Sequence, residues 1–492
     1  MTKIMLISPP LSSDPRVKIP NHQVPLGFLY MADILEKKGF SVKILDCPLY
    51  YKIRTKISET SIKFGLQPEQ ISREIQEFKP DIVGVSCSFS MFESDSFDMV
   101  DLVKKISPKS MIVVGGAHAS SNTKHVLRNE NINLAVIGEG ELTLLEIAQR
   151  YRDRKRLDNI KGTALIRNKK IIINKPRELI KNLDDLQPAW HLLDLKKYFE
   201  HPDNSLFVIR SPSINIATSR GCPGNCSFCS VQTVWGRKWR AMSAKKVVDD
   251  IEFLYKNYKV RHFRINDDNL TLDKKRIIEI CKEILKRKID IKWDTPSGIA
   301  LWTLDKEVLS TMKKSGYYRV TFGIESGSKR SLKYICKNID LEKTRKLIDH
   351  CHKIGLWVAS FFIIGFPFET FEDIKLTEEY ILTSGINFPF VFVAQPYPGT
   401  KMYQDFLYAG LLTSGLQDIS NSTISKYRTK NFSAEQLNSF RRKIYIKFYL
   451  SKLLSYMNPV VFHREFLSKI KSAEDLKYVL KIMKSMAVNL VY

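Results

Sequence analysis

Short apolar segments alternate with amphipathic helical segments along two long stretches of the chain, and this alternation constrains the fold more than any other feature. Such alternation is typical of α/β proteins with parallel sheets. In the first stretch it predicts a helix over residues 26–38 and strands over residues 4–8, 42–46, 81–86, 111–116 and 134–138. These strands end at Gly, Ser or Asp, and doubly wound sheets bind ligands at the carboxyl ends of their strands.

A second stretch of alternation begins near residue 213. It predicts strands over residues 214–218, 262–266, 292–295, 319–323, 357–364 and 390–394. The predicted helices between them cover residues 244–258, 274–286, 306–314, 329–334, 341–354 and 370–383. Six strand–helix units suit an open, partial (β/α)6 barrel better than a closed barrel of eight units.

We therefore predict an α/β chain of four regions: a Rossmann-like doubly wound domain, a hairpin with a linker, the partial barrel and a basic helical C-terminal extension. Their expected bounds are 1–150, 151–212, 213–400 and 401–492. The hairpin is expected to pair residues 163–167 with 170–174, and the extension is most clearly helical over 440–456 and 473–491.

The balance of charged residues is strongly basic, with 78 Lys and Arg against 52 Asp and Glu and a net charge of +26. This excess could attract nucleic acid, anionic lipid headgroups or phosphorylated substrates. It fits a solvated basic surface equally well, because the charges are spread over the whole chain. The sequence has neither a signal peptide at its start nor an apolar run that could cross a membrane, which predicts a cytoplasmic protein.

Three of the eight cysteines lie close together in a loop that contains Gly and Pro and follows the predicted strand 214–218. They are Cys222, Cys226 and Cys229, with the spacing C-x3-C-x2-C. In a reducing compartment such a cluster indicates metal binding or catalysis. Three thiolates can bind one face of a 4Fe–4S cube and leave one iron open to another ligand. A structural zinc site requires four ligands, and the next histidine, His262, lies beyond a predicted helix.

The loop resembles the radical S-adenosylmethionine (SAM) superfamily, because an aromatic residue, Phe228, directly precedes the third cysteine of this spacing. The resemblance implies that Cys222, Cys226 and Cys229 hold a 4Fe–4S cluster and that SAM chelates its fourth iron. One electron, from a donor such as flavodoxin or ferredoxin, would then cleave SAM into methionine and a 5′-deoxyadenosyl radical that abstracts hydrogen from the substrate.

Four further segments at predicted strand ends resemble the SAM-binding segments of this superfamily. Residues 266–269 (Asn-Asp-Asp-Asn) stand where many relatives have Gly-Gly-Glu-Pro, a substitution that resembles the cobalamin-dependent branch. Residues 321–327 resemble the strand end that binds ribose and carboxylate, 363–369 the adenine-contacting turn, and 395–400 the closing barrel segment. The resemblance implies SAM contacts from Phe228, Asp267, Asp268, Gly323, Glu325, Ser326, Gly365, Pro367 and Pro398.

The N-terminal segments 25–27, 84–88, 114–118 and 138–141 resemble the cobalamin-binding domain that is fused to many radical SAM enzymes. Glycines at strand ends let the backbone approach a flat macrocycle, and Ser hydroxyls can bond its nucleotide tail. The resemblance implies contacts to cobalamin from Ser86, Ser88, Gly115, Gly116, His118, Gly138 and Glu139. We expect His118 to be a loop histidine near the ligand rather than a cobalt ligand.

The motif Asp-x-His-x-x-Gly, whose histidine coordinates cobalt in many cobalamin proteins, is absent from the sequence. Its nearest formal match, residues 350–355, has His in place of Asp and lies on a predicted barrel helix. The absence fits enzymes that bind cobalamin without such a histidine, and it equally fits a domain that has lost cobalamin. A dinucleotide is disfavoured, because no Gly-x-Gly-x-x-Gly follows the first strand.

The segment 440–456 mixes Lys and Arg with aromatic and aliphatic residues at helical spacing. One interpretation is an interfacial helix at the inner face of an anionic membrane, which would make a lipid or isoprenoid substrate attractive. We favour a helix that covers the barrel and lays the aliphatic stems of Lys and Arg along apolar surface.

These resemblances predict a cobalamin-dependent radical SAM enzyme, foremost a methyltransferase that acts on an unactivated carbon of a small-molecule substrate. A cyclase or another enzyme that forms carbon–carbon bonds is the alternative within the same layout. Methylthiolation is disfavoured, because it requires a second set of N-terminal cysteines and only Cys47 and Cys87 are present. A non-catalytic cobalamin- or RNA-binding protein leaves the cysteine loop unexplained, so we expect no nucleic-acid partner.

Overall fold

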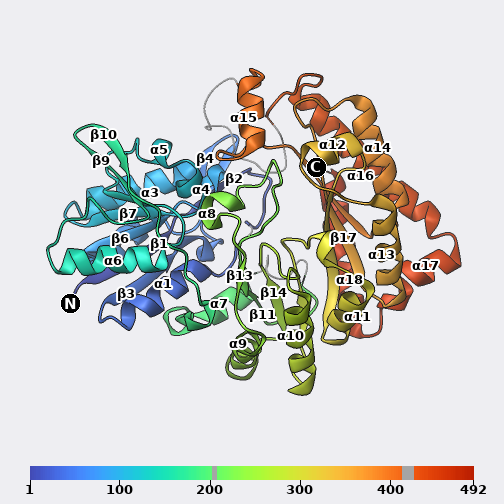
Figure 1. Ribbon diagram of the computed structural model, residues 1–492, viewed down its shortest axis with the longest axis horizontal. Coiled ribbons are helices and arrows are strands. Elements are labelled where there is room, and N and C mark those ends of the chain that lie inside the picture. The colour runs from blue at the N-terminus through green and yellow to red at the C-terminus, as the bar shows by residue number, and fades with distance from the viewer. Residues whose placement is uncertain (21, 202–207, 413–425, 492) are drawn as a thin grey trace.

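The computed structural model describes residues 1–20, 22–201, 208–412 and 426–491. It contains two large sheets, each with its own helices, and the chain passes from the first to the second near its middle (Figure 1). Residues 202–207 of the predicted linker and residues 413–425 of the predicted C-terminal extension lie outside the described part of the chain.

The first large sheet has seven strands in the order β10-β9-β8-β7-β6-β1-β3. The strands from β8 to β3 are parallel, and β9 and β10 form an antiparallel hairpin on the β8 edge. The strands are β1 (Lys3–Ser8), β3 (Ser41–Asp46), β6 (Ile82–Ser86), β7 (Met111–Gly115), β8 (Leu134–Val136), β9 (Thr163–Arg167) and β10 (Lys170–Ile173). The predicted hairpin is therefore present, and it extends the parallel sheet.

Helices cover both faces of this sheet because its strands are apolar on both sides. Met5 and Ile7 of β1 pack with α2 and α3, whereas Ile4 and Leu6 pack with α1 and α6. The helices are α1 (Leu26–Glu36), α2 (Pro68–Phe78), α3 (Glu93–Ile106), α4 (Ala117–Ser121), α5 (Thr123–Val126) and α6 (Glu141–Arg152). This arrangement confirms the predicted Rossmann-like, doubly wound domain.

A small antiparallel sheet in the order β2-β5-β4 was not anticipated from the sequence. Its strands are β2 (Leu11–Ser13), β4 (Arg54–Ser58) and β5 (Ser61–Phe64). The strand β4 reads Arg-Thr-Lys-Ile-Ser and is mostly exposed, so it carries no apolar signal of its own.

The second large sheet has six parallel strands in the order β11-β14-β15-β16-β17-β18. They are β11 (Ser213–Ile216), β14 (His262–Ile265), β15 (Lys292–Asp294), β16 (Tyr317–Glu325), β17 (Trp357–Ile364) and β18 (Phe388–Val393). The helices between them are α9 (Ala244–Asn257), α10 (Lys274–Lys286), α11 (Lys306–Lys314), α12 (Lys329–Tyr334), α13 (Leu341–Lys353) and α14 (Phe371–Thr383). Strands β11 and β18 are not paired with each other, so the barrel is open, as predicted.

Short elements join these regions. Helix α7 (Leu195–Glu200) precedes β11, and the hairpin of β12 (Ser219–Arg220) with β13 (Arg240–Ala241) encloses helix α8 (Val231–Trp235). Helix α8 packs against α4 of the first domain (Figure 1). The segment between β12 and β13 is therefore one part of the barrel that reaches the Rossmann-like domain.

The C-terminal region is helical, with α15 (Lys401–Tyr408), α16 (Ala434–Ser455), α17 (Pro459–Glu465) and α18 (Ala473–Val491). Helix α16 begins earlier than the predicted residue 440, because Ser433 and Gln436 form a capping box there. It packs against β18 and α14, which supports its role as a cover of the barrel. In the described ranges, no helix combines the length and the apolar character needed to span a membrane.

Helix α18 closes the end of the barrel where the strands begin. Tyr478 and Ile482 pack with Trp357 and Phe388, the first residues of β17 and β18. The amino ends of β17 and β18 are thus covered by this helix.

Candidate functional site

The carboxyl ends of the strands of both large sheets border a cavity of about 530 Å³. On the barrel side it is lined by residues after β11 and β14 and by α8, including Arg220, Trp235, Asn266 and Asp268. On the other side it is lined by glycines and serines at the ends of β6, β7 and β8. All predicted cobalamin contacts except His118 are among the lining residues: Ser86, Ser88, Gly115, Gly116, Gly138 and Glu139.

Gly116 shows why this rim requires glycine. Its φ is +129°, and a Cβ atom there would lie 2.7 Å from the carbonyl oxygen of Cys87. A side chain would therefore strain the backbone and collide with the neighbouring strand end. The Oγ atoms of Ser86 and Ser88 lie 3.0 Å apart on the same rim, so a polar edge borders the glycine surface.

His118 differs from its expected position. It lies in the short helix α4 rather than in a loop, and it is buried. Its Nε2 atom is 2.7 Å from Oε1 of Glu93, and its Nδ1 atom is 2.7 Å from Oγ of Ser90. Both ring nitrogens are thus used inside the first domain. Among the described residues that line the cavity there is no histidine, in keeping with the absence of the Asp-x-His-x-x-Gly motif.

A buried ion-pair network joins the two domains directly beside the cysteine loop. Arg220 donates through Nη1 to Glu139 at 2.8 Å and through Nη2 to Glu141 at 2.7 Å. Arg240 donates to the same Glu139 at 2.9 Å and to the carbonyl oxygen of Ile180 at 2.6 Å. Sequence reasoning assigned Glu139 to cobalamin, but its carboxylate is held by these two arginines and by the Ile180 backbone N–H.

Arg220 also lies between two aromatic rings. Its guanidinium carbon is 5.4 Å from the ring centroid of Tyr30 in α1 and 5.2 Å from that of Trp235 in α8. The carboxylates of Glu139 and Glu141 raise the pKa of Arg220, although burial opposes the charge. One cation, two residues before Cys222, thus contacts a ring from each domain and two carboxylates of the first domain.

The thiols of Cys222 and Cys226 flank Gly224, and the thiol of Cys229 is close enough to both for them to act on its pKa. A Cβ atom on Gly224 would lie 3.3 Å from Sγ of Cys222 and 3.9 Å from Sγ of Cys226, so a larger residue would crowd both. Burial raises the pKa of Cys229 to about 11 and that of Cys226 above its usual range, and each shift includes a contribution from the neighbouring thiols. Binding of iron would therefore displace protons from these thiols.

Lys337 is a part of this site that sequence reasoning missed. Its Nζ atom donates to Oε1 of Glu325 at 2.7 Å and to the carbonyl oxygen of Gly323 at 2.9 Å. It also lies 5.8 Å from the ring centroid of Phe228, and its charge lowers the pKa of Cys226. Lys337 thus brings together three predicted SAM contacts and the cysteine loop. No sequence signal indicated it, because it follows α12 without a characteristic spacing.

Glu325 ends β16 in an unusual backbone conformation. Its φ is +71°, in the left-handed region that non-glycine residues rarely adopt. Such conformations persist where the surroundings hold them, and they are frequent at functional sites. Here the Lys337 ion pair provides that constraint.

The two aspartates after β14 have different environments. Asp267 accepts hydrogen bonds from the backbone N–H and the hydroxyl of Thr218 and from the hydroxyl of Ser219, all at 2.6 Å. It therefore holds the start of the cysteine loop and does not line the cavity. Asp268 lines the cavity and accepts a bond from the Gly221 N–H at 2.8 Å. Burial raises the pKa of Asp268 to about 6.

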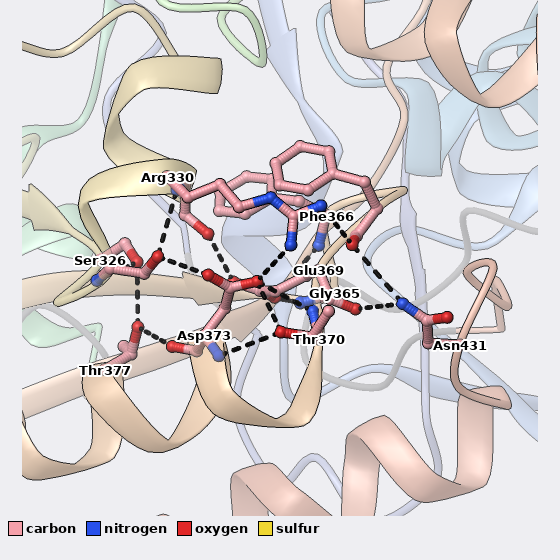
Figure 2. A network of polar contacts seen from close by, with 12 residues as sticks. Ser326, Arg330, Gly365, Phe366, Glu369, Thr370, Asp373, Thr377 and Asn431 are labelled. Carbon is pink, nitrogen blue, oxygen red and sulfur yellow. Dashed lines mark hydrogen bonds and ion pairs between the residues drawn. The ribbon is translucent and has the colours of Figure 1, made fainter.

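A polar network supports the predicted adenine-contacting turn (Figure 2). The buried carboxylate of Glu369 accepts bonds from the backbone N–H groups of Gly365 and Phe366 and from the hydroxyl of Ser331. Its own carbonyl oxygen accepts from Asn431 at 2.9 Å. Burial raises the pKa of Glu369 to about 7. Glu369 thus folds back onto its own turn and shapes the backbone at Gly365.

The same network reaches the end of β16 (Figure 2). Asp373 accepts from the hydroxyls of Ser328 and Thr370, at 2.6 and 2.8 Å, and from Arg330 at 3.1 Å. The Oγ atom of Ser326 is 2.9 Å from Oγ1 of Thr377. Ser326 is fully buried, so its hydroxyl positions the strand end rather than facing the cavity.

The two remaining predicted SAM contacts, Pro367 and Pro398, lie where segments that are distant in the sequence meet. The carbonyl oxygen of Pro367 accepts from the Lys430 N–H at 3.2 Å. Pro398 is buried, and next to it a Cβ atom on Gly399 would lie 2.7 Å from a Thr233 methyl group and 3.2 Å from Cβ of Ser121. The closing barrel segment therefore contacts both α8 and α4.

The residues present fit a cluster and a macrocyclic cofactor at this interface. Three thiols with a nearby cation suit an iron–sulfur cube, whose thiolate ligands bring negative charge. In the described part of the chain, no three His, Cys, Asp or Glu side chains converge on a single metal ion. A cube does not require that geometry, because each thiolate binds a different iron. The glycine-lined cavity, in turn, admits a flat ligand close to the backbone.

Comparison with known proteins matches both halves of the chain. Residues 14–148 match the B12 binding domain, and residues 216–381 match the radical SAM superfamily. The chain is 32% identical over 443 residues to cytidylyl-2-hydroxyethylphosphonate methyltransferase of Streptomyces wedmorensis, covering 83% of this chain and 82% of the relative. It is 28% identical over 348 residues to anaerobic magnesium-protoporphyrin IX monomethyl ester cyclase of Rubrivivax gelatinosus, covering 69% and 61%.

Among solved structures, the chain is similar to the cobalamin-dependent S-adenosylmethionine radical enzyme OxsB. The TM-score is 0.71 at 18% sequence identity, and the match covers 99% of this chain and 75% of the other. That structure has aqua-cobalamin and S-adenosylmethionine bound. The likeness extends over both large sheets and the C-terminal helices.

Proposed function

Because the chain belongs to the cobalamin-dependent radical SAM methyltransferase-like enzymes, we propose that it transfers a methyl group to an unactivated carbon of a small-molecule substrate. The cofactors of this family are a 4Fe–4S cluster, SAM and cobalamin. One observation carries the proposal: the cysteine loop and the glycine-lined cavity meet at one interface, joined by Arg220. A reaction in which two cofactors act on one substrate requires that the binding sites of both cofactors border the same space.

Cys222, Cys226 and Cys229 would hold the cluster, and the residues around Lys337 would hold SAM. Glu325 and Gly323 belong to that second group, together with the turn at Gly365. Ser86, Ser88 and the glycines at 115, 116 and 138 would hold cobalamin. When bound, the cluster supplies the electron that cleaves SAM, and cobalamin carries the methyl group.

The protein's own residues bind and position the reactants. Lys337 orients the Glu325 carboxylate, and Asp267 fixes the start of the cysteine loop through Thr218 and Ser219. Helix α18 closes the amino end of the barrel and so limits water access to a reactive radical. His118 and Glu369 act within the protein framework, on α4 and on the turn at Gly365.

The relatives leave one alternative, which is ring formation without methyl transfer. It is favoured by the likeness to the cyclase of Rubrivivax gelatinosus. The methyltransferase of Streptomyces wedmorensis matches with higher identity and over more of both chains, which favours methyl transfer.

We further propose that the electron comes from an acidic carrier protein such as flavodoxin or ferredoxin. The net charge of +26 supports this, because opposite charges speed the encounter of two proteins.

The test of methyl transfer is product analysis. Protein reconstituted anaerobically with iron, sulfide and cobalamin is incubated with SAM, reductant and candidate substrates, and the products are measured by mass spectrometry. Methyl transfer is expected to yield 5′-deoxyadenosine, which carries the abstracted hydrogen, together with S-adenosylhomocysteine and a product heavier than the substrate by one CH2 unit, because a methyl group replaces that hydrogen. Formation of 5′-deoxyadenosine with a cyclised, unmethylated product would support the alternative instead.

A peripheral membrane contact is a separate proposal, which rests on the end of α16. Leu437, Ile444 and Phe448 are buried against the barrel. The C-terminal end of α16 instead exposes apolar side chains next to cations such as Lys447. The exposed fractions of these apolar side chains are 56% for Leu450, 68% for Leu453, 66% for Leu454 and 77% for Met457. Apolar side chains beside cations suit an anionic lipid surface.

For this contact, the double variant Leu453→Glu/Leu454→Glu is expected to lower partitioning into phosphatidylserine-containing vesicles at least about tenfold, because two leucines lose their burial. Vesicle flotation measures the partitioning. The variant Ile57→Glu/Thr60→Glu adds the same charge to an exposed hairpin of the first domain and should float like the wild type. Failure of the wild type to float with anionic vesicles would end this proposal.

A further inference from the structure

The inner face of the barrel sheet continues below the cavity. In β14, Phe263 and Ile265 pack with the surrounding helices, so Arg264 and Asn266 point to the opposite, inner face. Asn266 lines the cavity, and Arg264 lies one inner-facing position deeper. The side chain of Arg264 is partly accessible, whereas Phe263 and Ile265 are buried.

Arg264 brings a positive charge to this face, and among the described residues it forms no ion pair with a carboxylate. The nearby carboxylate of Asp294 is bound by Arg319 and lies 3.3 Å from Nε2 of His262. Burial favours the neutral acid, yet Arg319, His262 and Arg264 together hold the pKa of Asp294 well below its usual range. Burial also lowers the pKa of His262, which favours its neutral form. Two guanidinium groups thus act on one carboxylate, which is bound by Arg319 and not by Arg264.

Among the polar atoms on this face that lack hydrogen-bond partners in the described chain, one belongs to Arg264 and one to Asn266. The buried Nε of Arg264 has none, and within the part of the chain that the structure describes the Arg264 side chain makes no hydrogen bond. Two positions along the strand, the buried Oδ1 of Asn266 also has none, although the Nδ2 of Asn266 is bonded to Gln23. Buried polar groups are normally paired, so a donor and an acceptor left open on adjacent inner positions indicate a ligand.

An aromatic wall shares the inner face. The ring centroid of Phe361 lies 5.6 Å from that of Phe390 and 5.9 Å from that of Phe392. These three phenylalanines are partly accessible, whereas the outward-facing Phe362, Val391 and Val393 are buried against helices. The accessible inner face therefore offers a cation and an acceptor on β14 and an apolar surface on β17 and β18.

We infer that Arg264 binds an anionic oxyacid group of the substrate, a phosphate, phosphonate or carboxylate. In this arrangement Asn266 accepts a hydrogen bond from a hydroxyl or amide of the same molecule, and the phenylalanines contact its carbon skeleton. Guanidinium groups bind such anions through paired N–H donors. The inference rests on the proposed function, because it names the substrate class of the same site. The substrate would enter at the cavity and extend its charged end toward the barrel floor.

The test uses phenylphosphonate and benzoate as probes, with benzamide as the neutral comparison, titrated calorimetrically into reconstituted protein. Binding of at least one anion is expected, and Arg264→Gln should weaken it about ten- to hundredfold. Arg264→Lys should restore part of the loss, since it keeps the charge. The relative strength of the two anions distinguishes a phosphonate-type group from a carboxylate.

The matched control is Arg261→Gln, which removes the same charge from a side chain that stacks on Tyr255 and bonds backbone carbonyls. This control should bind the probes like the wild type. Equal anion binding by Arg264→Gln and wild type, or equal loss in the control, would overturn the inference. Iron content and reductive formation of 5′-deoxyadenosine are measured in parallel. If the wild type has no iron and forms no 5′-deoxyadenosine, the proposed function is contradicted and not the anion site.

Discussion

Replacing Cys226 with alanine is expected to abolish the iron–sulfur cluster and, with it, reductive cleavage of SAM. The Cys226 thiol is partly buried near Cys222 and the Lys337 ammonium, whereas the further thiol that acts on its pKa, Cys336, is exposed and lies outside the loop. Loss of an outer partner of a metal site commonly costs 10- to 100-fold in affinity or activity, and loss of a ligand should exceed about 100-fold. Iron and sulfide analysis, the visible absorbance of the cluster and the yield of 5′-deoxyadenosine measure the effect.

The matched control for this prediction is Cys336→Ala. Cys336 is exposed and lies next to Lys337 outside the loop, and its weak contact is to the Tyr334 carbonyl oxygen. This variant should keep its full iron content. Retention of an intact cluster by Cys226→Ala would mean that the loop does not hold it, and the proposed reaction would lose its starting point.

The second large effect is expected from Arg220→Gln, which removes the cation that joins the two domains. Glu139 and Glu141 would remain buried, with only Arg240 left to oppose them. Removing one partner of a buried ion pair typically costs about 3–5 kcal/mol, because an uncompensated charge remains. The free energy of unfolding, measured by urea denaturation, should fall by this amount.

Two further sets of variants distinguish loss of the buried ion-pair network from a general effect of removing one positive charge. Arg156→Gln removes an arginine that pairs with Asp158 while its side chain is 76% exposed, and it should leave the free energy of unfolding nearly unchanged, because solvent screens the pair. Adding Glu139→Gln and Glu141→Gln to the Arg220 variant should recover much of the lost free energy of unfolding, because burying a neutral side chain costs less free energy than burying a charged one. If Arg220→Gln is as stable as Arg156→Gln, the network does not hold the domains together.

Much of the fold could be predicted because it follows from local patterns. Most parallel strands of the two large sheets are apolar runs close to the expected bounds, and the helices between them carry one apolar stripe. The small sheet of β2, β4 and β5 was missed because β4 is polar and exposed. The early start of α16 was missed because its capping residues precede the apolar segment. The expected bounds of the four regions stay predictions.

The candidate site was predictable in part for the same reason. The cysteine spacing and the glycines at strand ends lie within single loops, where the sequence order decides which groups can meet. The prediction that His118 lies in a loop was wrong, because its place after the two glycines does not reveal that its ring contacts Glu93. The role of Lys337 was not predicted, because the short helix α12 separates it in the sequence from its partner Glu325.

The sequence by itself determined the α/β class, the open barrel, the cysteine loop and the family, since each depends on residue types at fixed local spacing. Only the tertiary structure decided that Glu139 binds Arg220 and Arg240, that Asp267 turns inward while Asp268 lines the cavity, and that Arg264 faces the inside of the barrel. These outcomes depend on which strand ends face each other across two domains. A buried charge takes the partner that the assembled fold brings within reach, and spacing along the chain does not encode that distance.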